Sequence, residues 1–253
     1  MRFAEFDYEQ RDLDKGYNNR TLYVNVSEMK ILEKPVSDQM KEIFVGGKGF
    51  DLWLLWNGLP WDRAIKWDDP ENEICIACGP LGGTTIYPGS GKSIAVTISP
   101  LTGSIIDSNV GGYFGPYLKF SGWDAIEIQG KAKSDIVIVI DGDSNKVYIE
   151  EGSDLPKETH LLGALLTKKY GKENLRSIST VTAGPGAKNT FFGCLNFSWY
   201  DTVRRTVRYK QAGRGGIGTV LRNKNILALV AKKTYPSPKW VINTKEIPKL
   251  REG

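Results

Sequence analysis

The chain has 253 residues, of which 40% are hydrophobic, so it can form one large domain or two small ones with a sizeable core. The 34 Lys and Arg residues against 29 Asp and Glu give a formal net charge of +5, too small by itself to indicate a nucleic-acid partner. Three cysteines make no disulfide framework, no apolar run reaches the length of a membrane span, and the N-terminal residues are polar, so we expect a cytoplasmic protein.

The first half of the chain predicts strands and two helices. Residues 1–19 are charged and aperiodic, and we expect them to form an arm that packs on something else. Ser37 is the expected N-cap of the first helix, with Met40 three residues on. Alternating patterns and apolar runs predict the other elements: a strand at 20–26, its hairpin partner at 29–33, an apolar helix at 50–56 whose Trp53 and Trp56 are core residues, and strands at 74–78, 93–98 and 104–107.

The second half repeats this order of elements. It predicts, in turn, a hairpin of 135–141 and 146–150 around a turn, a helix at 160–170 closed by Gly171, and strands at 178–182 and 191–197. The separation of Pro80 from Gly112 is nearly that of Pro185 from Gly216. Chance recurrence of Gly-Pro and Gly-Gly in a chain with 28 glycines is the alternative explanation.

Because the whole order repeats, we predict an α+β, β-rich fold of two β-sheets related by an internal pseudo-twofold, with a few short helices. The half-repeats are expected at about 20–133 and 134–233, followed by a tail at 234–253. Such a fold predicts two similar sub-sites.

Two glycine clusters stand out, Asn-Val-Gly-Gly-Tyr-Phe-Gly at 109–115 and Ala-Gly-Arg-Gly-Gly-Ile-Gly at 212–218. Each is predicted to open a short helix that is followed by a strand, at 121–128 and 225–230. Glycine lacks a Cβ, so backbone N–H groups can approach a bulky ligand closely, and a helix start directs its N–H groups at an anion. The clusters therefore predict two anionic groups, or one ligand with two halves.

Two nucleotide motifs fail on their context. Gly91-Lys92-Ser93 resembles the end of a P-loop, but Ile86 stands where the motif requires glycine. Lys92 remains a candidate anion contact, with a solvated turn lysine as the alternative. Residues 213–218 fit the dinucleotide fingerprint as a string, but a basic segment precedes them and no acid follows at the required distance, so we reject a nicotinamide site.

No catalytic set is recognisable among the reactive side chains. Cys75 and Cys78 lie in an apolar strand, where their side chains cannot easily share a metal, so both are expected in the core. His160 opens a helix and is a poor candidate for a general base. A basic run surrounds the second glycine cluster and favours phosphate binding, with nucleic acid as the competing explanation, at Arg204, Arg205, Arg208, Lys210 and Arg214.

Five segments give the chain a resemblance to one family. They are ACGPLGGT at 77–84, SPLTG at 99–103, SNVGGYFG at 108–115, LKFSGWD at 118–124 and AGRGGIG at 212–218. As a set in this order they are specific, and from about residue 20 to 232 the chain resembles the N-terminal domain of the tungsten-containing aldehyde ferredoxin oxidoreductase family.

The resemblance implies that a tungsten or molybdenum bis-pterin cofactor sits on this domain, one pterin per half. It also implies a Mg²⁺ that bridges the pterin phosphates through the backbone carbonyls of Asn109 and Gln211. Lys92 and Lys210 would take the places of family basic residues, and as lysines they lose the bidentate fork of arginine. Further cofactor contacts are expected at Val110, Gly111, Gly112, Tyr113, Ala212, Gly213, Arg214, Gly215 and Gly216. Tyr113 and Phe114 are the local candidates for substrate contact, with core packing as the alternative.

Full-length relatives also carry four cluster cysteines and two acidic pterin-binding loops, which this sequence lacks. The resemblance therefore implies a fragment, or a cofactor-binding subunit of a split oxidoreductase whose larger catalytic partner carries the iron–sulfur cluster. The arm at 1–19 and the tail at 234–253 would suit docking to that partner. The expected reaction is oxidation of aldehydes to carboxylic acids, or the reverse, with a ferredoxin-like electron carrier. The alternatives are a subunit of an aromatic acyl-CoA reductase of the same family and a non-catalytic scaffold or cofactor chaperone.

Overall fold

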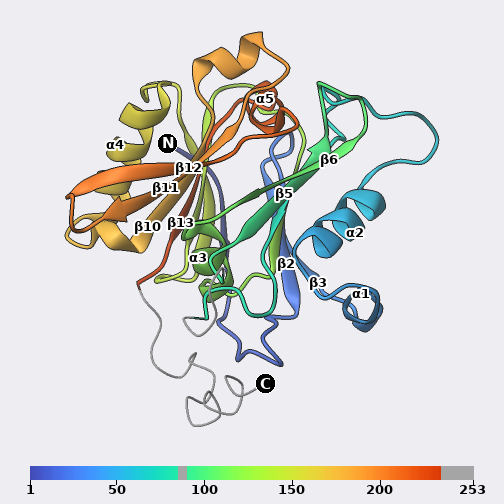
Figure 1. The fold of residues 1–253 in the computed structure, drawn as a ribbon, viewed down its shortest axis with the longest axis horizontal. Coiled ribbons are helices and arrows are strands. Elements are labelled where there is room, and N and C mark those ends of the chain that lie inside the picture. Colours follow the sequence, from blue (N-terminus) through green and yellow to red (C-terminus); the bar gives the residue numbers. More distant parts are fainter. Residues whose placement is uncertain (85–89, 235–253) are drawn as a thin grey trace.

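Two mixed β-sheets packed face to face form the body of the protein (Figure 1). The computed structural model describes residues 1–84 and 90–234. One sheet has six strands in the order β3-β2-β7-β4-β5-β6. They are β2 (Arg20–Asn25), β3 (Lys30–Pro35), β4 (Ile74–Ala77), β5 (Ser93–Ile98), β6 (Ile105–Val110) and β7 (Ala125–Gln129).

The other sheet has seven strands in the order β1-β9-β8-β13-β10-β11-β12. They are β1 (Arg2–Asp7), β8 (Ile136–Asp141), β9 (Lys146–Glu151), β10 (Ile178–Thr182), β11 (Leu195–Asp201), β12 (Thr206–Ala212) and β13 (Ile226–Lys232). Apart from β1, each strand takes the place of its counterpart in the first sheet. A parallel pair occupies the same place in each, β2 with β7 and β8 with β13. The predicted α+β, β-rich fold of two related sheets is confirmed.

Short helices complete the two halves in matching positions. They are α1 (Asp38–Ile43), α2 (Lys48–Gly58), α3 (Phe114–Phe120), α4 (Thr159–Gly171) and α5 (Ile217–Asn223), with 3-10 turns η1 (Leu175–Ser177) and η2 (Pro185–Asn189). The expected N-cap is present, because Ser37 Oγ accepts a hydrogen bond of 3.1 Å from the Met40 N–H. Helix α4 ends at Gly171 as predicted, but the positive φ, 49°, falls on Lys172. Trp56 was expected in the core but is exposed and packs edge-on against Trp61.

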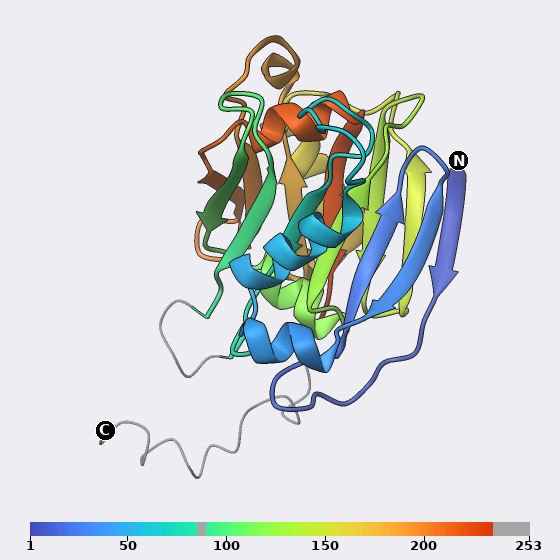
Figure 2. The same ribbon diagram turned by 90° about the vertical axis from the view of Figure 1, so that its right-hand side faces the viewer.

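Strand alternation builds three hydrophobic clusters in layers. In β8, Ile138 and Ile140 face the other sheet, whereas Val137 and Val139 face α4. In the six-stranded sheet, β4 likewise presents Ile76 inward and its cysteine outward, toward α2. Figure 2, turned by 90°, shows α1 and α2 on the outer side of that sheet. The two sheets therefore share one central core, and each sheet has its own outer cluster of hydrophobic residues.

Three strand predictions differ from the structure. Residues 2–7, which we assigned to an aperiodic arm, form β1 and pair with β9, because Phe3, Ala4 and Phe6 find packing partners on the central core. Residues 206–212, which contain Arg208 and Lys210 of the basic run, form the edge strand β12, whose alternating pattern was overlooked. The strand expected at 191–197 is β11 and begins only at Leu195, which leaves Phe191 and Phe192 exposed.

Among the described residues no helix is long and apolar enough to cross a membrane. The expected docking tail at 234–253 lies, beyond Thr234, outside the described residues.

Candidate functional site

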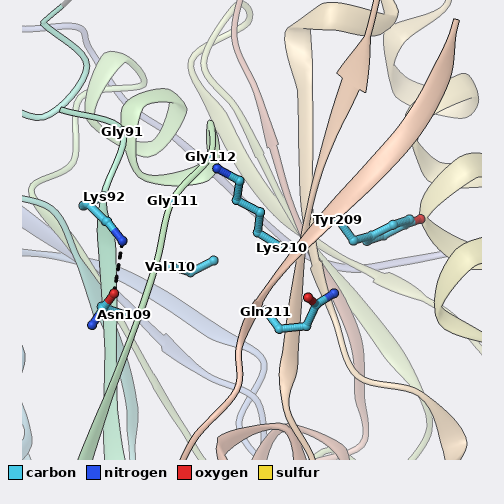
Figure 3. Close-up of a pocket in the computed structure, with 9 residues that line it drawn as sticks. All are labelled: Gly91, Lys92, Asn109, Val110, Gly111, Gly112, Tyr209, Lys210 and Gln211. Carbon is cyan, nitrogen blue, oxygen red and sulfur yellow. Dashed lines mark hydrogen bonds between the residues drawn. The ribbon is translucent and has the colours of Figure 1, made fainter. Parts of the chain in front are cut away.

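A cavity of about 530 Å³ lies between β6 and β12, the edge strands of the two sheets (Figure 3). Each half of the chain therefore supplies one wall, as the internal repeat predicts for a ligand with two halves. The lining residues come from the turn before β5, from β6 and the glycine cluster that follows it, and from β12. They are Gly91, Lys92, Asn109, Val110, Gly111, Gly112, Tyr209, Lys210 and Gln211.

Hydrogen bonds between the halves fix the two walls relative to each other. Ser99 Oγ donates to the Gly215 carbonyl at 2.8 Å, and the Arg214 N–H donates to Ser108 Oγ at 3.1 Å. Ser108 lies one residue before Asn109 on β6, so this contact ties the two glycine clusters together. The cavity is thus part of the junction between the half-repeats.

Two lysines enter the cavity from opposite walls. Lys92 Nζ donates to Asn109 Oδ1 at 3.2 Å, and the Lys210 side chain points toward Gly112 (Figure 3). Neither lysine forms an ion pair within 1–84 and 90–234, whereas Lys48 nearby is bound to Asp107 of β6 at 2.6 Å. Two cations without a carboxylate partner create a positive potential, which favours an anionic ligand.

Two glycines of the first cluster, Gly111 and Gly112, leave open space at the cavity. A Cβ built on Gly112, where φ is 137°, would meet no atom within 4 Å, and one on Gly111 would lie 3.5 Å from Lys210 Nζ. Both positions line the cavity. They form a surface of bare backbone that a ligand can approach more closely than any other residue would allow.

The second cluster is built differently. A Cβ on Gly215 would lie 2.5 Å from Ile106, and one on Gly216 would collide with the Phe191 carbonyl oxygen and lie 2.7 Å from Pro100. Their φ angles are 73° and 70°, and Gly216 is the N-cap of α5. These two glycines make room for the protein's own chain.

The structure brings together only part of the predicted contact set. The predicted residues that line the cavity are Lys92, Asn109, Val110, Gly111, Gly112, Lys210 and Gln211. Those outside the lining are Tyr113, Ala212, Gly213, Arg214, Gly215 and Gly216. Phe114, a candidate for substrate contact, is buried and packs edge-on against Phe197, so it is a core residue. The sequence analysis missed Gly91 and Tyr209, although Gly91 immediately precedes Lys92.

The cations of the basic run differ in the groups that they contact. Asp201 lies 3.0 Å from Arg204 and 3.6 Å from Arg208, so these two arginines are partly neutralised. Lys210 instead lies 5.7 Å from the Trp199 ring centroid and reaches the cavity. Of the five cations, Lys210 alone lines the cavity.

The two cysteines of the first half have the environment of core residues, as predicted. Cys75 and Cys78 are buried, and Cys78 Sγ lies 3.6 Å from the Gly115 carbonyl oxygen, whereas Cys75 packs toward α2. Burial raises the pKa of Cys78 to about 11 and that of Cys75 well above its usual value. Within the described residues no cluster of His, Cys, Asp and Glu could hold a metal ion.

Comparison with known proteins gives concordant results. The sequence matches the family model of the aldehyde ferredoxin oxidoreductase N-terminal domain over residues 21–233. It is 33% identical over 223 residues to the tungsten-containing aldehyde ferredoxin oxidoreductase of Pyrococcus horikoshii, covering 86% of this chain and 33% of that protein. It is 31% identical over 256 residues to the aliphatic sulfonate oxidoreductase, WOR-like subunit, of Pyrococcus furiosus, covering 94% of this chain and 38% of that protein.

A solved structure is similar as well. The active site complex BamBC of benzoyl coenzyme A reductase with 1,5-dienoyl-CoA superposes with a TM-score of 0.74 and 27% identity, covering 87% of this chain and 31% of that chain. The chain thus spans about a third of the length of the relatives it matches.

Proposed function

The chain belongs to the aldehyde ferredoxin oxidoreductase family, because nearly all of it matches the N-terminal domain of that family. We propose that it is the cofactor-binding part of a tungsten or molybdenum bis-pterin oxidoreductase. One observation carries the proposal: the cavity is lined by both half-repeats and combines bare glycine backbone with two lysines that lack carboxylate partners among the described residues. A two-part anionic ligand requires such a surface.

The residues present fit that cofactor. The open positions at Gly111 and Gly112 form a cradle that any Cβ would fill, and a planar pterin can lie against it. Lys210 and Lys92 would pair with phosphate oxygens, each as a point charge. The carbonyls of Asn109 and Gln211, on the two facing walls, would hold a Mg²⁺ between the phosphates. When bound, the cofactor supplies the two-electron chemistry, and this chain orients it and sets the local charge.

We propose aldehyde oxidation to a carboxylic acid, or the reverse, as the reaction, with a ferredoxin-like electron carrier and a larger catalytic partner that carries an iron–sulfur cluster. The name of the Pyrococcus horikoshii relative supports the substrate class. The words "subunit" and "complex" in the descriptions of two other relatives support a multi-part enzyme. A cytoplasmic location, where such carriers are reduced, agrees with this proposal.

A second candidate rests on the structural neighbour. Because that complex is a benzoyl coenzyme A reductase, reduction of an aromatic acyl-CoA is the competing activity for the same cofactor site. The cavity described here binds the cofactor rather than the substrate, so both activities use it in the same way.

The test is anaerobic purification of the tagged chain from its native cells, with tungsten and molybdenum measured in the eluate and co-eluting proteins identified. Metal retained in wild type and lost in Lys210→Glu, together with a cysteine-bearing partner, supports the proposal. Activity with aldehydes against aromatic acyl-CoA esters then separates the two reactions. A metal-free wild-type chain that elutes alone contradicts the proposal and favours a scaffold or cofactor chaperone.

A further inference from the structure

A second, smaller cavity of about 260 Å³ lies at the C-terminal end of α5, away from the residues that line the first. Elements far apart in the sequence meet there: the segment before β4, the turn after β7, η2 and α5. Its lining residues are Trp67, Lys131, Lys188, Thr219, Arg222, Asn223 and Asn225. We propose that this cavity binds a phosphate or diphosphate group of a small ligand, independently of the bis-pterin site.

Cations outnumber anions around this cavity. Asp135 accepts from Arg222 at 3.1 Å, lies 3.0 Å from Lys157 and 3.9 Å from Lys188, and is nearly buried. Among the described residues, the charged groups that act most on Lys188 are the cations Arg222, Lys157 and Lys131 and a single anion, Asp135. One carboxylate cannot balance four cations, so the cavity has an excess of positive charge.

The charge excess shows in the titration of the lining groups. Burial lowers the pKa of Lys188, and the charge of Arg222 lowers it further. Burial pushes the pKa of Asp135 up, but the hydrogen bond from Lys157 and the charge of Arg222 outweigh it, so the pKa lies below its usual value. An added anion would relieve the repulsion among the cations.

The lysines are positioned rather than free. Lys131 Nζ donates to Asn223 Oδ1 at 2.9 Å, and Lys188 Nζ donates to Asn225 Oδ1 at 3.2 Å. Amide partners orient an ammonium group without neutralising it, so each keeps its charge and spare donors for a ligand. Asn225, at φ 58°, is itself held by a 2.8 Å hydrogen bond from its Nδ2 to the Ala132 carbonyl.

Arg222 supplies a rigid floor for the cavity. It is fully buried, and its two terminal nitrogens donate to the Ile226 carbonyl and to Asp135 at 2.9 and 3.1 Å. Its Nε is buried and has no hydrogen-bond partner among the described residues. The hydrogen bonds to the Ile226 carbonyl and to Asp135 hold the guanidinium group, and its charge, in a fixed position beside the cavity.

The size and donor set favour phosphate over a larger ligand or a single carboxylate. The volume lies just below the range of cavities that enclose whole drug-sized molecules. Donors arranged on several sides suit a multiply charged group with several acceptor oxygens, which a carboxylate lacks. Trp67, which packs edge-on against Phe191 at 5.9 Å, leaves an apolar rim for the organic part of the ligand.

The test is calorimetric titration of the full chain with inorganic phosphate and with pyrophosphate, at constant ionic strength. Lys188→Met and Lys131→Met should each weaken binding at this site at least about tenfold, because each removes a charge-assisted hydrogen bond. Lys188→Arg, which keeps the charge, should restore most of the affinity. Both lysine side chains are partly exposed, so these variants should keep the wild-type circular dichroism spectrum and melting temperature.

Two controls separate this site from other cationic surfaces. Lys169→Met removes a surface lysine that pairs with Glu150 at 2.8 Å and should leave binding unchanged. Lys210→Met removes one of the two cations of the first cavity and should leave binding at the second cavity unchanged. Any binding that it weakens should be binding that Lys188→Met leaves unchanged. The proposal is overturned if wild type binds neither anion at millimolar concentration, if Lys188→Met binds as wild type does, or if succinate binds as tightly as pyrophosphate.

Discussion

The two glycine clusters look alike in the sequence but do different work in the structure. In the first cluster, Gly111 and Gly112 line the cavity, and a Cβ on either would meet open space or the end of a flexible lysine. In the second, Gly215 and Gly216 press against Ile106 and Phe191, and their positive φ angles start α5. Gly111 and Gly112 of the first cluster thus leave the cavity open, whereas Gly215 and Gly216 of the second close the junction between the half-repeats.

The difference shows that an internal repeat can keep its fold while its copies diverge in role. Both halves retain the strand order, the parallel pair and the helix after the glycine cluster. What differs is the surroundings of these glycines: open space beside the pair in the first cluster, and Ile106, Pro100 and Phe191 against the pair in the second. The same substitution made in each cluster should therefore affect a different property: stability in one cluster and cofactor occupancy in the other.

Gly216→Val should have the largest effect, on folding itself. It forces a β-branched residue into a left-handed conformation and against the Phe191 carbonyl, so we expect a loss of roughly 3–5 kcal/mol in the free energy of unfolding. The matched control is Gly103→Val, because Gly103 has φ 67° but no atom within 4 Å of its Cβ position. Urea denaturation measures both. Equal losses in the two variants would show that backbone strain alone, and no close contact, explains Gly216.

Gly111→Val should instead spare the fold and remove the cofactor. The φ of Gly111 is not positive and its Cβ would make ordinary contact with Lys210, so the melting temperature should stay close to that of wild type. The added side chain projects into the cavity, and we expect tungsten or molybdenum occupancy to fall by more than about tenfold. Gly186→Val, at an open position in η2, is the control. Full occupancy in Gly111→Val would mean that the cofactor lies elsewhere.

Lys210→Glu tests the charge on the wall that the second half supplies. Reversing this charge should lower cofactor retention about tenfold, because a paired phosphate contact becomes a repulsion. Arg204→Glu makes the same change on the same hairpin, but at a residue that pairs with Asp201, and should have little effect on retention. Lys92→Met should cause a smaller loss than Lys210→Glu. Metal content after gel filtration measures each variant, and equal losses in Lys210→Glu and Arg204→Glu would indicate a general effect of charge.

The halves also differ in their buried carboxylates. Glu73, just before β4, is buried with Oε1 unpaired, whereas the matching residue before β10 is Ser177. Burial and, to a smaller extent, the charge of Glu127 together raise the pKa of Glu73 to about 8. Since the folded state holds this proton more tightly, the stabilisation is complete below the unfolded pKa near 4.5 and is lost as pH rises through 8.

Glu73→Gln should remove that dependence. The stability of wild type relative to Glu73→Gln should fall on the order of 1 kcal/mol per pH unit between pH 5 and pH 8. Glu158→Gln is the control, because backbone hydrogen bonds from Leu161 and His160 lower the pKa of exposed Glu158 to about 2, outside this range. Its stability curve should run parallel to that of wild type. If the stability of Glu73→Gln varied with pH just as that of wild type does, Glu73 would be ionised in the folded protein.

Local patterns predicted most of the fold and part of the site. The alternation in β8, the N-cap at Ser37 and the glycines before α3 and α5 all act through neighbours in sequence, so they could be interpreted without coordinates. The failures have a common cause. Strand β1 exists because β9 offers an edge, and Phe114 is buried because Phe197 lies opposite.

The sequence by itself determined the repeat, the two sheets and the lysines and glycines that line the first cavity. Those features depend on side-chain periodicity and on the conformational freedom of glycine, which are local properties. Only the tertiary structure decided which glycines line the first cavity and which pack against the chain, and only it assembled Lys131, Lys188 and Arg222 around one cavity. The physical reason is that steric room and electrostatic potential at a residue are set by the segments packed against it, and these lie far away in the sequence.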